Sequence, residues 1–207
     1  MGTLINGNDN IPYSICSNPN NCSNDSLAPF HVYQGSPLRG LLNSHRPLKD
    51  CGPNHLGAKD LATWYRSPNG QQIITTSIGT PVYAAEAGTI LQLSFGWDHC
   101  GCNNPNCRDS NFVGIRSDTP DKSITHYVHV SPLPGLKIGD HIMIGQQIGT
   151  VDISGDSCGP HVHMARYNQN GIPTCNWVID ITQIPTHSWW NTVFGMQYHP
   201  YPYHPHR

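Results

Sequence analysis

The 207-residue chain has little charge, since only 12% of its residues are Asp, Glu, Lys or Arg, about half of the usual share. Its 11 basic and 13 acidic residues leave a net charge of −2, which gives no reason to expect nucleic acid or an anionic membrane as a partner. No apolar run approaches the roughly 18 residues that a membrane-spanning helix requires. The first 16 residues show neither the basic nor the apolar region of a secretory signal. We therefore expect no transmembrane segment and no visible leader.

Helical periodicity is also missing, because no long segment repeats apolar residues at helical spacing. Short apolar stretches separated by Gly and Pro recur instead, about ten residues apart. This pattern predicts an all-β fold, an antiparallel sandwich or half-barrel with long loops and little helix. The candidate strands are 73–78, 81–86, 88–95, 111–117, 123–130, 141–151 and 161–167.

Histidine and cysteine are abundant, with 13 His and 8 Cys against 4 Phe and 4 Met. An even number of cysteines in a chain of this size favours disulfides and an oxidising compartment, so we expect an extracellular or cell-surface protein. The sequence does not decide which cysteines pair with one another. A thiolate metal site at Cys100, Cys102 and Cys107 ranks lower, because this polar loop has no second cysteine pair at zinc-finger spacing.

Composition divides the chain into three parts. Residues 1–35 are rich in Asn, Ser and Pro and contain two cysteines, so they predict an N-terminal extension clipped by a disulfide. Residues 36–185 contain the candidate strands and form the expected main domain. Residues 186–207 alternate Pro with His and Tyr and predict an extended tail, since proline excludes a helix or a central strand.

The first candidate site lies in the last predicted strand. Side chains alternate along a strand, so His161 and His163 point to the same face, about 7 Å apart, while Val162 and Met164 face the core. Two adjacent imidazoles outside the core are natural as a metal ligand and a second polar group. Two solvent-exposed histidines on an edge strand are the alternative.

A second histidine cluster lies in the 123–130 strand. Val128 and Val130 mark the buried face there, which sends Tyr127 and His129 to the opposite face. His126 falls on the side of the valines and is interpreted as structural. His129 is therefore the functional candidate.

The third cluster contains His55 and Asp60, which we place in a loop before the sheet begins. With the flexible Gly57 between them, both side chains can reach one cation. His45 and Asp50 have the same spacing, but proline stiffens that segment, so this pair ranks lower.

Together these segments resemble the lysostaphin/LytM-type zinc metallopeptidases, the murein endopeptidases of bacterial cell walls. The resemblance covers about residues 50–168 and follows the family's order through HLGAKD, GTPVYAAEAGTI, HYVHVS, GLKIGDHIMIGQQIGTV and SGDSCGPHVH. It implies a LytM-like fold with a groove and one Zn²⁺, bound by the metal ligands His55, Asp60 and His163, beside the catalytic pair His129 and His161. HLGAKD has four residues between His and Asp, where the family usually has three.

The resemblance also implies the substrate, a peptide bond in a peptidoglycan stem or cross-bridge, and we expect a monomer. Stretches 61–78 and 96–110 look longer than the family's core and are expected to flank the groove.

The chemistry of such a site follows from its donor set. A His₂Asp set leaves the fourth position of zinc for water, whose pKa falls to about 7. One histidine then takes a proton from the water and passes it to the leaving amine, and the other stabilises the oxyanion. We give His161 the role of base and His129 the supporting role, although the order could be reversed. Tyr127 either assists the oxyanion or packs, and packing is favoured.

Three other functions fit the sequence less well. A non-catalytic LytM-like cell-wall-binding or regulatory domain would lack ligands or catalytic histidines, whereas all five positions are occupied here. A lipoyl- or biotinyl-type carrier needs a modified lysine, and no Met-Lys or Lys-Met pair occurs. A disulfide-stapled module that binds metal through the C-terminal histidines would lack rigid geometry. These tail residues are His199, His204 and His206.

Overall fold

The computed structural model describes residues 2–6, 25–39, 46–51, 55–104, 106–107 and 109–180. These residues form strands, turns and loops, and no helix occurs among them. In the described part of the chain, no helix is long and apolar enough to cross a membrane. The prediction of a helix-poor, all-β fold is confirmed.

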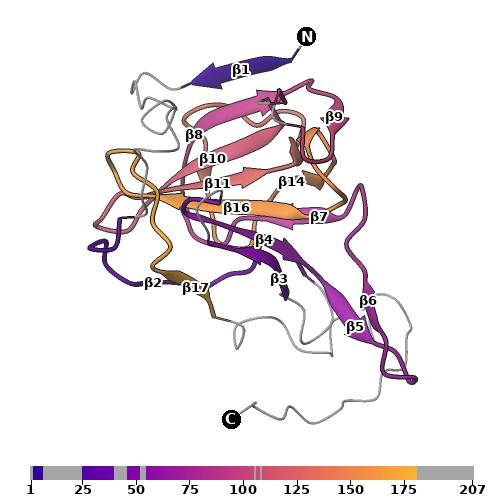
Figure 1. The fold of residues 1–207 in the computed structure, drawn as a ribbon. Helices are drawn as coiled ribbons and strands as arrows, with labels where there is room; N and C mark the ends of the chain where they lie inside the picture. Colours follow the sequence, from indigo (N-terminus) through magenta and orange to yellow (C-terminus); the bar gives the residue numbers. More distant parts are fainter. Residues whose placement is uncertain are drawn as a thin grey trace.

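One large antiparallel sheet dominates the fold, in the order β1-β8-β10-β11-β16-β4-β3 (Figure 1). Its strands are β1 (Thr3–Asn6), β8 (Gly88–Phe95), β10 (Phe112–Ser117), β11 (Ile124–Val128), β16 (Val162–Tyr167), β4 (Ala58–Ala62) and β3 (Arg46–Asp50). A short strand, β13 (His141–Ile142), also pairs with β8. The path from β1 to β3 does not close on itself, so the sheet is open rather than a barrel.

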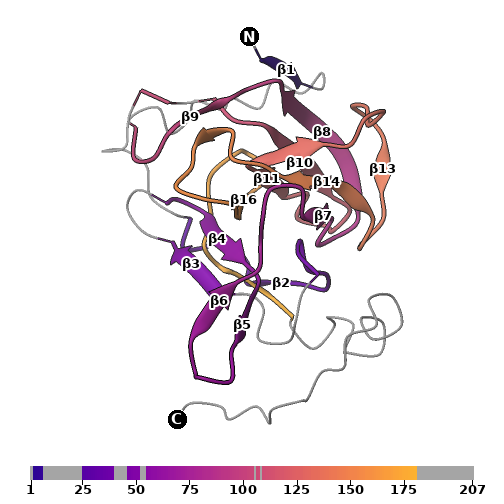
Figure 2. The same cartoon turned by 90° about the vertical axis from the view of Figure 1, so that its right-hand side faces the viewer.

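Smaller sheets complete the architecture. Three strands pair in the order β12 (Val130–Pro132), β14 (Gln147–Val151) and β7 (Pro81–Tyr83). The two-stranded pairs are β5 (Trp64–Arg66) with β6 (Gln72–Ile74), β9 (His99–Gly101) with β15 (Gly155–Asp156), and β2 (His31–Tyr33) with β17 (Trp177–Ile179). The β5–β6 hairpin projects from the body of the molecule in both ribbon views (Figures 1 and 2).

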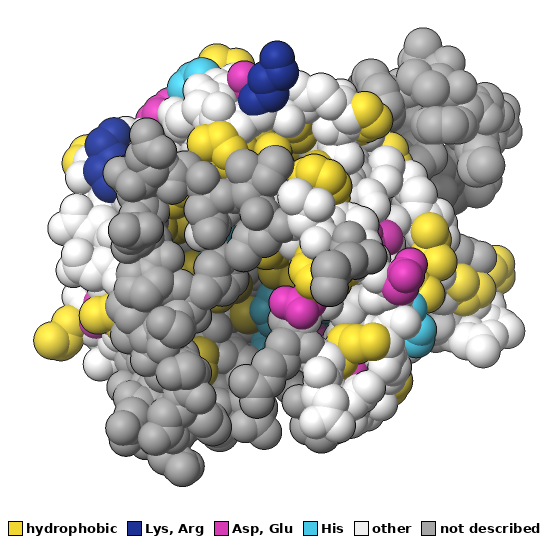
Figure 3. All heavy atoms as spheres, turned by 90° about the horizontal axis from the view of Figure 1, so that it is seen from above, with side chains coloured by type: hydrophobic (Ala, Val, Ile, Leu, Met, Phe, Trp, Pro, Cys, Tyr) yellow, Lys and Arg dark blue, Asp and Glu magenta, His cyan; other side chains and the backbone are white. Residues whose placement is uncertain are grey.

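The hydrophobic core joins the large sheet to the three-stranded sheet. Val113, Tyr127 and Met164 of the large sheet are fully buried in one cluster with Val130 and Ile148 of the smaller sheet. Few basic side chains are visible on the face of the molecule shown in Figure 3, and these Lys and Arg side chains lie near its outline.

A charged network is buried in the same domain. Arg166 is 1% exposed and donates hydrogen bonds to Glu86 Oε1 at 3.3 Å and to Asp121 Oδ2 at 2.9 Å. The hydroxyls of Thr125 and Ser117 donate to the two Glu86 oxygens, each at 2.8 Å. Burial alone would raise the pKa of Glu86, but the nearby His31 imidazole, 3.3 Å away, and the charge of Arg166 outweigh it, so the pKa is lowered.

The disulfide interpretation of the cysteines is confirmed for six of them. Disulfides join Cys51 to Cys175, Cys100 to Cys107, and Cys102 to Cys158. The thiolate metal site that competed for Cys100, Cys102 and Cys107 is therefore excluded. Cys16 and Cys22, and with them the clipped extension, lie outside the described residues, as does the 186–207 tail.

The segment before residue 70 differs from expectation. We predicted that the His55–Asp60 segment is a loop before the sheet, but Asp60 lies in β4, between β16 and β3. Residues 46–50, interpreted as a stiff loop, form β3. Neither strand shows the apolar alternation of a half-buried strand, which is why the pattern missed them. His45 lies outside the described residues.

Candidate metal centre and active site

Strand pairing brings the first two site residues together. In the antiparallel ladder between β4 and β16, Asp60 lies directly opposite His163, a position where side chains on one face are about 5 Å apart. Val162 and Met164 are fully buried, as predicted, and His161 and His163 both border the pocket. The pairing therefore places a carboxylate beside the two histidines.

A tight turn brings His55 to the same point. The turn closes with a hydrogen bond from Ala58 N–H to the His55 carbonyl at 3.2 Å. Gly57 occupies it with φ +68°, and a Cβ there would lie 2.7 Å from the Arg166 carbonyl oxygen. Only glycine tolerates both the positive φ and the close approach of the Arg166 carbonyl oxygen without strain.

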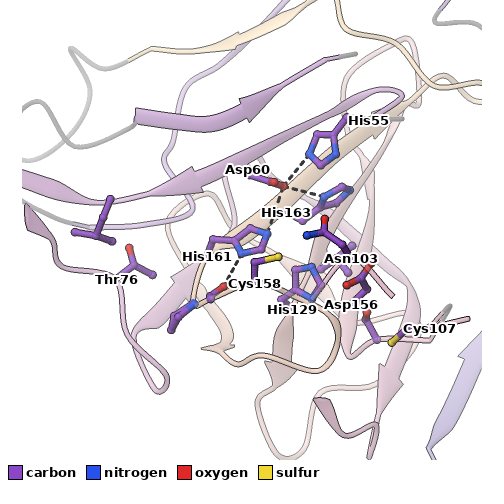
Figure 4. A pocket seen from close by; sticks show the side chains of 15 residues that line it. His55, Asp60, Thr76, Asn103, Cys107, His129, Asp156, Cys158, His161 and His163 are labelled. Carbon is purple, nitrogen blue, oxygen red and sulfur yellow. Dashed lines mark hydrogen bonds and ion pairs between the residues drawn. The ribbon is translucent and has the colours of Figure 1, made fainter. Parts of the chain in front are cut away.

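One oxygen atom is the centre of the cluster (Figure 4). Asp60 Oδ1 lies 2.8 Å from His55 Nε2, 3.0 Å from His163 Nδ1 and 3.4 Å from His161 Nε2. Burial raises the pKa of Asp60, but hydrogen bonds from His161, His163 and His55 outweigh burial and hold the pKa far below its usual range. The carboxylate is therefore ionised at neutral pH.

His129 joins the cluster in a way that the strand pattern did not predict. Its backbone has φ +59°, so strand alternation ends at this residue. The predicted faces are wrong here: Tyr127 is fully buried in the core, while the half-buried Val128 borders the pocket. The left-handed backbone directs His129 to the pocket nonetheless, with its ring centroid 4.7 Å from that of His161.

Backbone carbonyls fix the tautomers of His129 and His161. A carbonyl can only accept, so His129 Nδ1 donates to the Ser154 oxygen at 2.7 Å, and His161 Nδ1 donates to the Gly159 oxygen at 2.8 Å. In a neutral ring this leaves Nε2 as the proton-accepting atom. His129 can thus accept a proton at Nε2, whereas His161 Nε2, 3.4 Å from Asp60 Oδ1, accepts one only while its ring is neutral.

The two rings differ in their electrostatics. Burial, with the charges of His161 and His163, lowers the pKa of His129 to about 4. Burial acts in the same direction on His161, but the hydrogen bond and charge of Asp60 outweigh it and raise that pKa. Burial lowers the pKa of His163, which keeps its ring neutral as a metal ligand must be.

The cluster lies in a pocket of about 800 Å³. The predicted flanking stretches do border it: Ile74 and Thr76 come from 61–78, and Asn103 and Cys107 from 96–110. Asp156 borders it too, and our sequence reasoning missed it. Its place in SGDSCGPHVH, five residues before His161, was the available signal.

The remaining clustered residues are structural. His126 is buried, pairs through Nε2 with Gln92 Oε1 at 2.9 Å, and stacks on Phe112. Burial lowers its pKa to about 3. The Tyr127 hydroxyl accepts a hydrogen bond from Ala85 N–H at 2.8 Å inside the core, so the packing role is confirmed.

Comparison with known proteins shows the family of this chain. The model of Peptidase family M23 matches residues 67–174, just over half of the chain. The chain belongs to peptidase family M23. The matched segment contains His129, His161 and His163, whereas His55 and Asp60 precede it and are grouped with His163 by their geometry alone.

Lysostaphin is among the curated relatives of this M23 chain. The lysostaphins of Staphylococcus staphylolyticus and Staphylococcus simulans are each 34% identical over 91 residues, which is 44% of this chain and 16% of theirs. The chain therefore matches about a sixth of the length of these relatives.

Solved structures of peptidases are similar as well. The catalytic domain of lysostaphin from S. simulans is 26% identical, with a TM-score of 0.41 over 68% of this chain and 84% of that one. A zinc-containing peptidase from Vibrio cholerae is 19% identical, with a TM-score of 0.41 over 74% of this chain and 40% of that one.

The residues of the M23 chain fit a metal ion. Ligand atoms of His55, Asp60 and His163 all lie within 4.8 Å of one another. Zinc binds imidazole nitrogens and carboxylate oxygens at about 2.0–2.2 Å, so ligand atoms around one ion are about 3–4 Å apart. Two histidines and one carboxylate, with the pocket open beside them, are the donor set of a catalytic zinc site rather than a closed structural one.

Proposed function

We propose that this M23 protein is a zinc-dependent endopeptidase that hydrolyses a peptide bond in the stems or cross-bridges of peptidoglycan. His55, Asp60 and His163 would hold one Zn²⁺, and His129 and His161 would be the catalytic residues. The observation that carries the proposal is the approach of three imidazoles to Asp60 Oδ1 at the wall of an open pocket. Family membership supplies the peptidase chemistry.

The chain's own residues supply the proton transfers. Zinc, when bound, supplies a water molecule of lowered pKa and polarises the scissile carbonyl. His161 Nε2, directed toward the ligands by the Gly159 carbonyl, accepts the proton and delivers it to the leaving amine. His129, fixed by the Ser154 carbonyl, supports the oxyanion that develops on the substrate.

We also propose that the protein acts outside the cytoplasm or at the cell surface, as a monomer. Three disulfides among the described residues support this location, because such bonds persist in oxidising compartments. The lysostaphin relatives and the family support peptidoglycan as the substrate.

Metal removal tests the proposal. The purified protein is expected to contain one zinc per chain and to release peptides from purified peptidoglycan, as detected by mass spectrometry. A chelator should abolish release and added zinc should restore it, because the same folded protein then lacks and regains its metal. His163→Ala should be inactive, because it removes a ligand.

The matched control is His141→Ala. His141 is an exposed histidine that pairs with Asp118 at 2.7 Å, away from the pocket, so its substitution should leave peptide release unchanged. Undiminished release in excess chelator, with no metal bound, would contradict the proposal. One bound zinc without any hydrolysis would identify the alternative, a non-catalytic cell-wall-binding domain.

A further inference from the structure

The pocket has two chemically different ends on either side of the proposed metal site. In Figure 4, Thr76 lies apart from the cluster on the His161 side, whereas Asn103 and Asp156 lie beside His163 and His129. Ile74, 44% exposed, adds an apolar side chain to the Thr76 end. A bound peptide would therefore meet an uncharged surface on one side and a carboxylate on the other.

Asp156 is held firmly at its end. It belongs to β15, which pairs with β9 through Gly101, and the next residue, Ser157, donates from its N–H to the Gly101 carbonyl at 3.0 Å. One residue further, Cys158 is bonded to Cys102. Such anchoring on both sides is typical of a group whose position matters for recognition.

The charge of Asp156 lacks a counterpart in the described structure. Its Oδ1 is buried, and no hydrogen bond reaches that atom from any described residue. Among the described residues that border the pocket, none is Lys or Arg. The neighbouring His129 already donates its Nδ1 proton to Ser154. A carboxylate that is partly withdrawn from water and left unpaired is unfavourable, so a cation is expected to complete the site.

We propose that Asp156 is a specificity-determining residue that binds a positively charged amino group of the peptide substrate. The inference rests on the proposed function, because it concerns the substrate of the same pocket. The ammonium would lie at the Asn103–Asp156 end of the groove, against the face of the carboxylate that borders the pocket. The peptide on the other side of the scissile bond would lie along Ile74 and need no charge.

The test compares two forms of one substrate. Soluble muropeptides are released from peptidoglycan with a muramidase, and half of them are acetylated with acetic anhydride, which removes the ammonium charge. The wild-type protein should cleave the free-amine form with a kcat/KM about ten- to hundredfold higher, the range expected for a charge-assisted hydrogen bond. Asp156→Asn should bring the ratio of the two kcat/KM values close to one, mainly through KM.

Asp109→Asn is the matched control, since it removes an exposed carboxylate of the same region that does not border the pocket. It should keep the wild-type ratio. The inference would be overturned if Asp156→Asn lowered kcat/KM equally for both forms, or if the wild-type protein cleaved both forms with the same kcat/KM. Either result would leave the proposed function intact. A wild-type protein that cleaves neither form would overturn both.

Discussion

Asp60 combines two tasks in one carboxylate. Its Oδ1 contacts the imidazoles of both proposed histidine ligands and of His161, the proposed base. The ligand set and the catalytic pair are therefore linked through a single atom. Substitution of this residue would disturb both, so its effect on hydrolysis would not separate metal binding from proton transfer.

Tyr127 shows the opposite case, a polar residue near the site that serves packing alone. Tyr127→Phe should lower the free energy of unfolding by about 1–2 kcal/mol, because the buried Ala85 N–H loses its acceptor. The kcat for peptide hydrolysis should stay within about twofold of the wild-type value. Urea denaturation and kinetics check the two parts, and a hundredfold loss of kcat in a stable variant would instead indicate a role at the oxyanion.

The site residues were predictable to different degrees. The types and spacing of His161 and His163 indicate their common face directly, because both lie on one strand. His129 was placed correctly for a wrong reason, since its positive φ is invisible in an alternating pattern. Asp156 was missed, because its place in the pocket depends on pairing with Gly101, far away in sequence, and its position five residues before His161 was the one local signal.

At the scale of elements, the sequence predicts strands where apolar side chains alternate or run together, as in β8 and β16. It misses β3 and β4, whose sequences RPLKD and AKDLA carry charges in the middle. These strands form because their backbones complete the edge of the large sheet, a long-range effect that overrides local propensity. One of the three predicted metal ligands, Asp60, lies in these two strands.

The Cys102–Cys158 disulfide should act on substrate binding through the loop that it anchors. A double Cys102→Ser/Cys158→Ser variant should lose about 4 kcal/mol of unfolding free energy, because the bond closes a loop with a sequence separation of 56. The KM should rise about tenfold with a smaller change in kcat, because the bond anchors the neighbourhood of Asn103 and Asp156 rather than the metal ligands. Calorimetry and steady-state kinetics provide both readouts.

The Cys100–Cys107 disulfide offers a control within the same loop. Its sequence separation is only 7, so its removal should cost about 2 kcal/mol. Equal effects of the two double variants on stability and KM would contradict the anchoring role of Cys158.

At the scale of the whole molecule, the buried Glu86–Arg166 pair makes stability depend on acid pH. The pKa of Glu86 is lowered by folding, so its contribution is complete above the ordinary value of 4.5 and is lost as the pH falls below it. Glu86→Gln should therefore cost about 3–5 kcal/mol near pH 7, because the buried Arg166 loses the more buried of its two carboxylate partners, and progressively less below pH 4.5. Urea denaturation at several pH values measures this difference.

Asp118→Asn is the surface comparison for this prediction. Asp118 and its partner His141 are each 52% exposed, so the substitution should change stability by less than about 1 kcal/mol. A cost of Glu86→Gln that stays constant from pH 7 to pH 3 would contradict the role of the ionised pair.

The direct opposition of Asp60 and His163 has a consequence for folding fidelity. A slip of β4 by one residue against β16 would turn Asp60 to the opposite face and replace it with Lys59 or Leu61. Neither side chain is a usual zinc ligand, so a misregistered chain could not assemble the three-ligand site. Metal affinity is therefore a check on strand alignment, and a chain that binds the ion tightly has also paired β4 with β16 in the correct register.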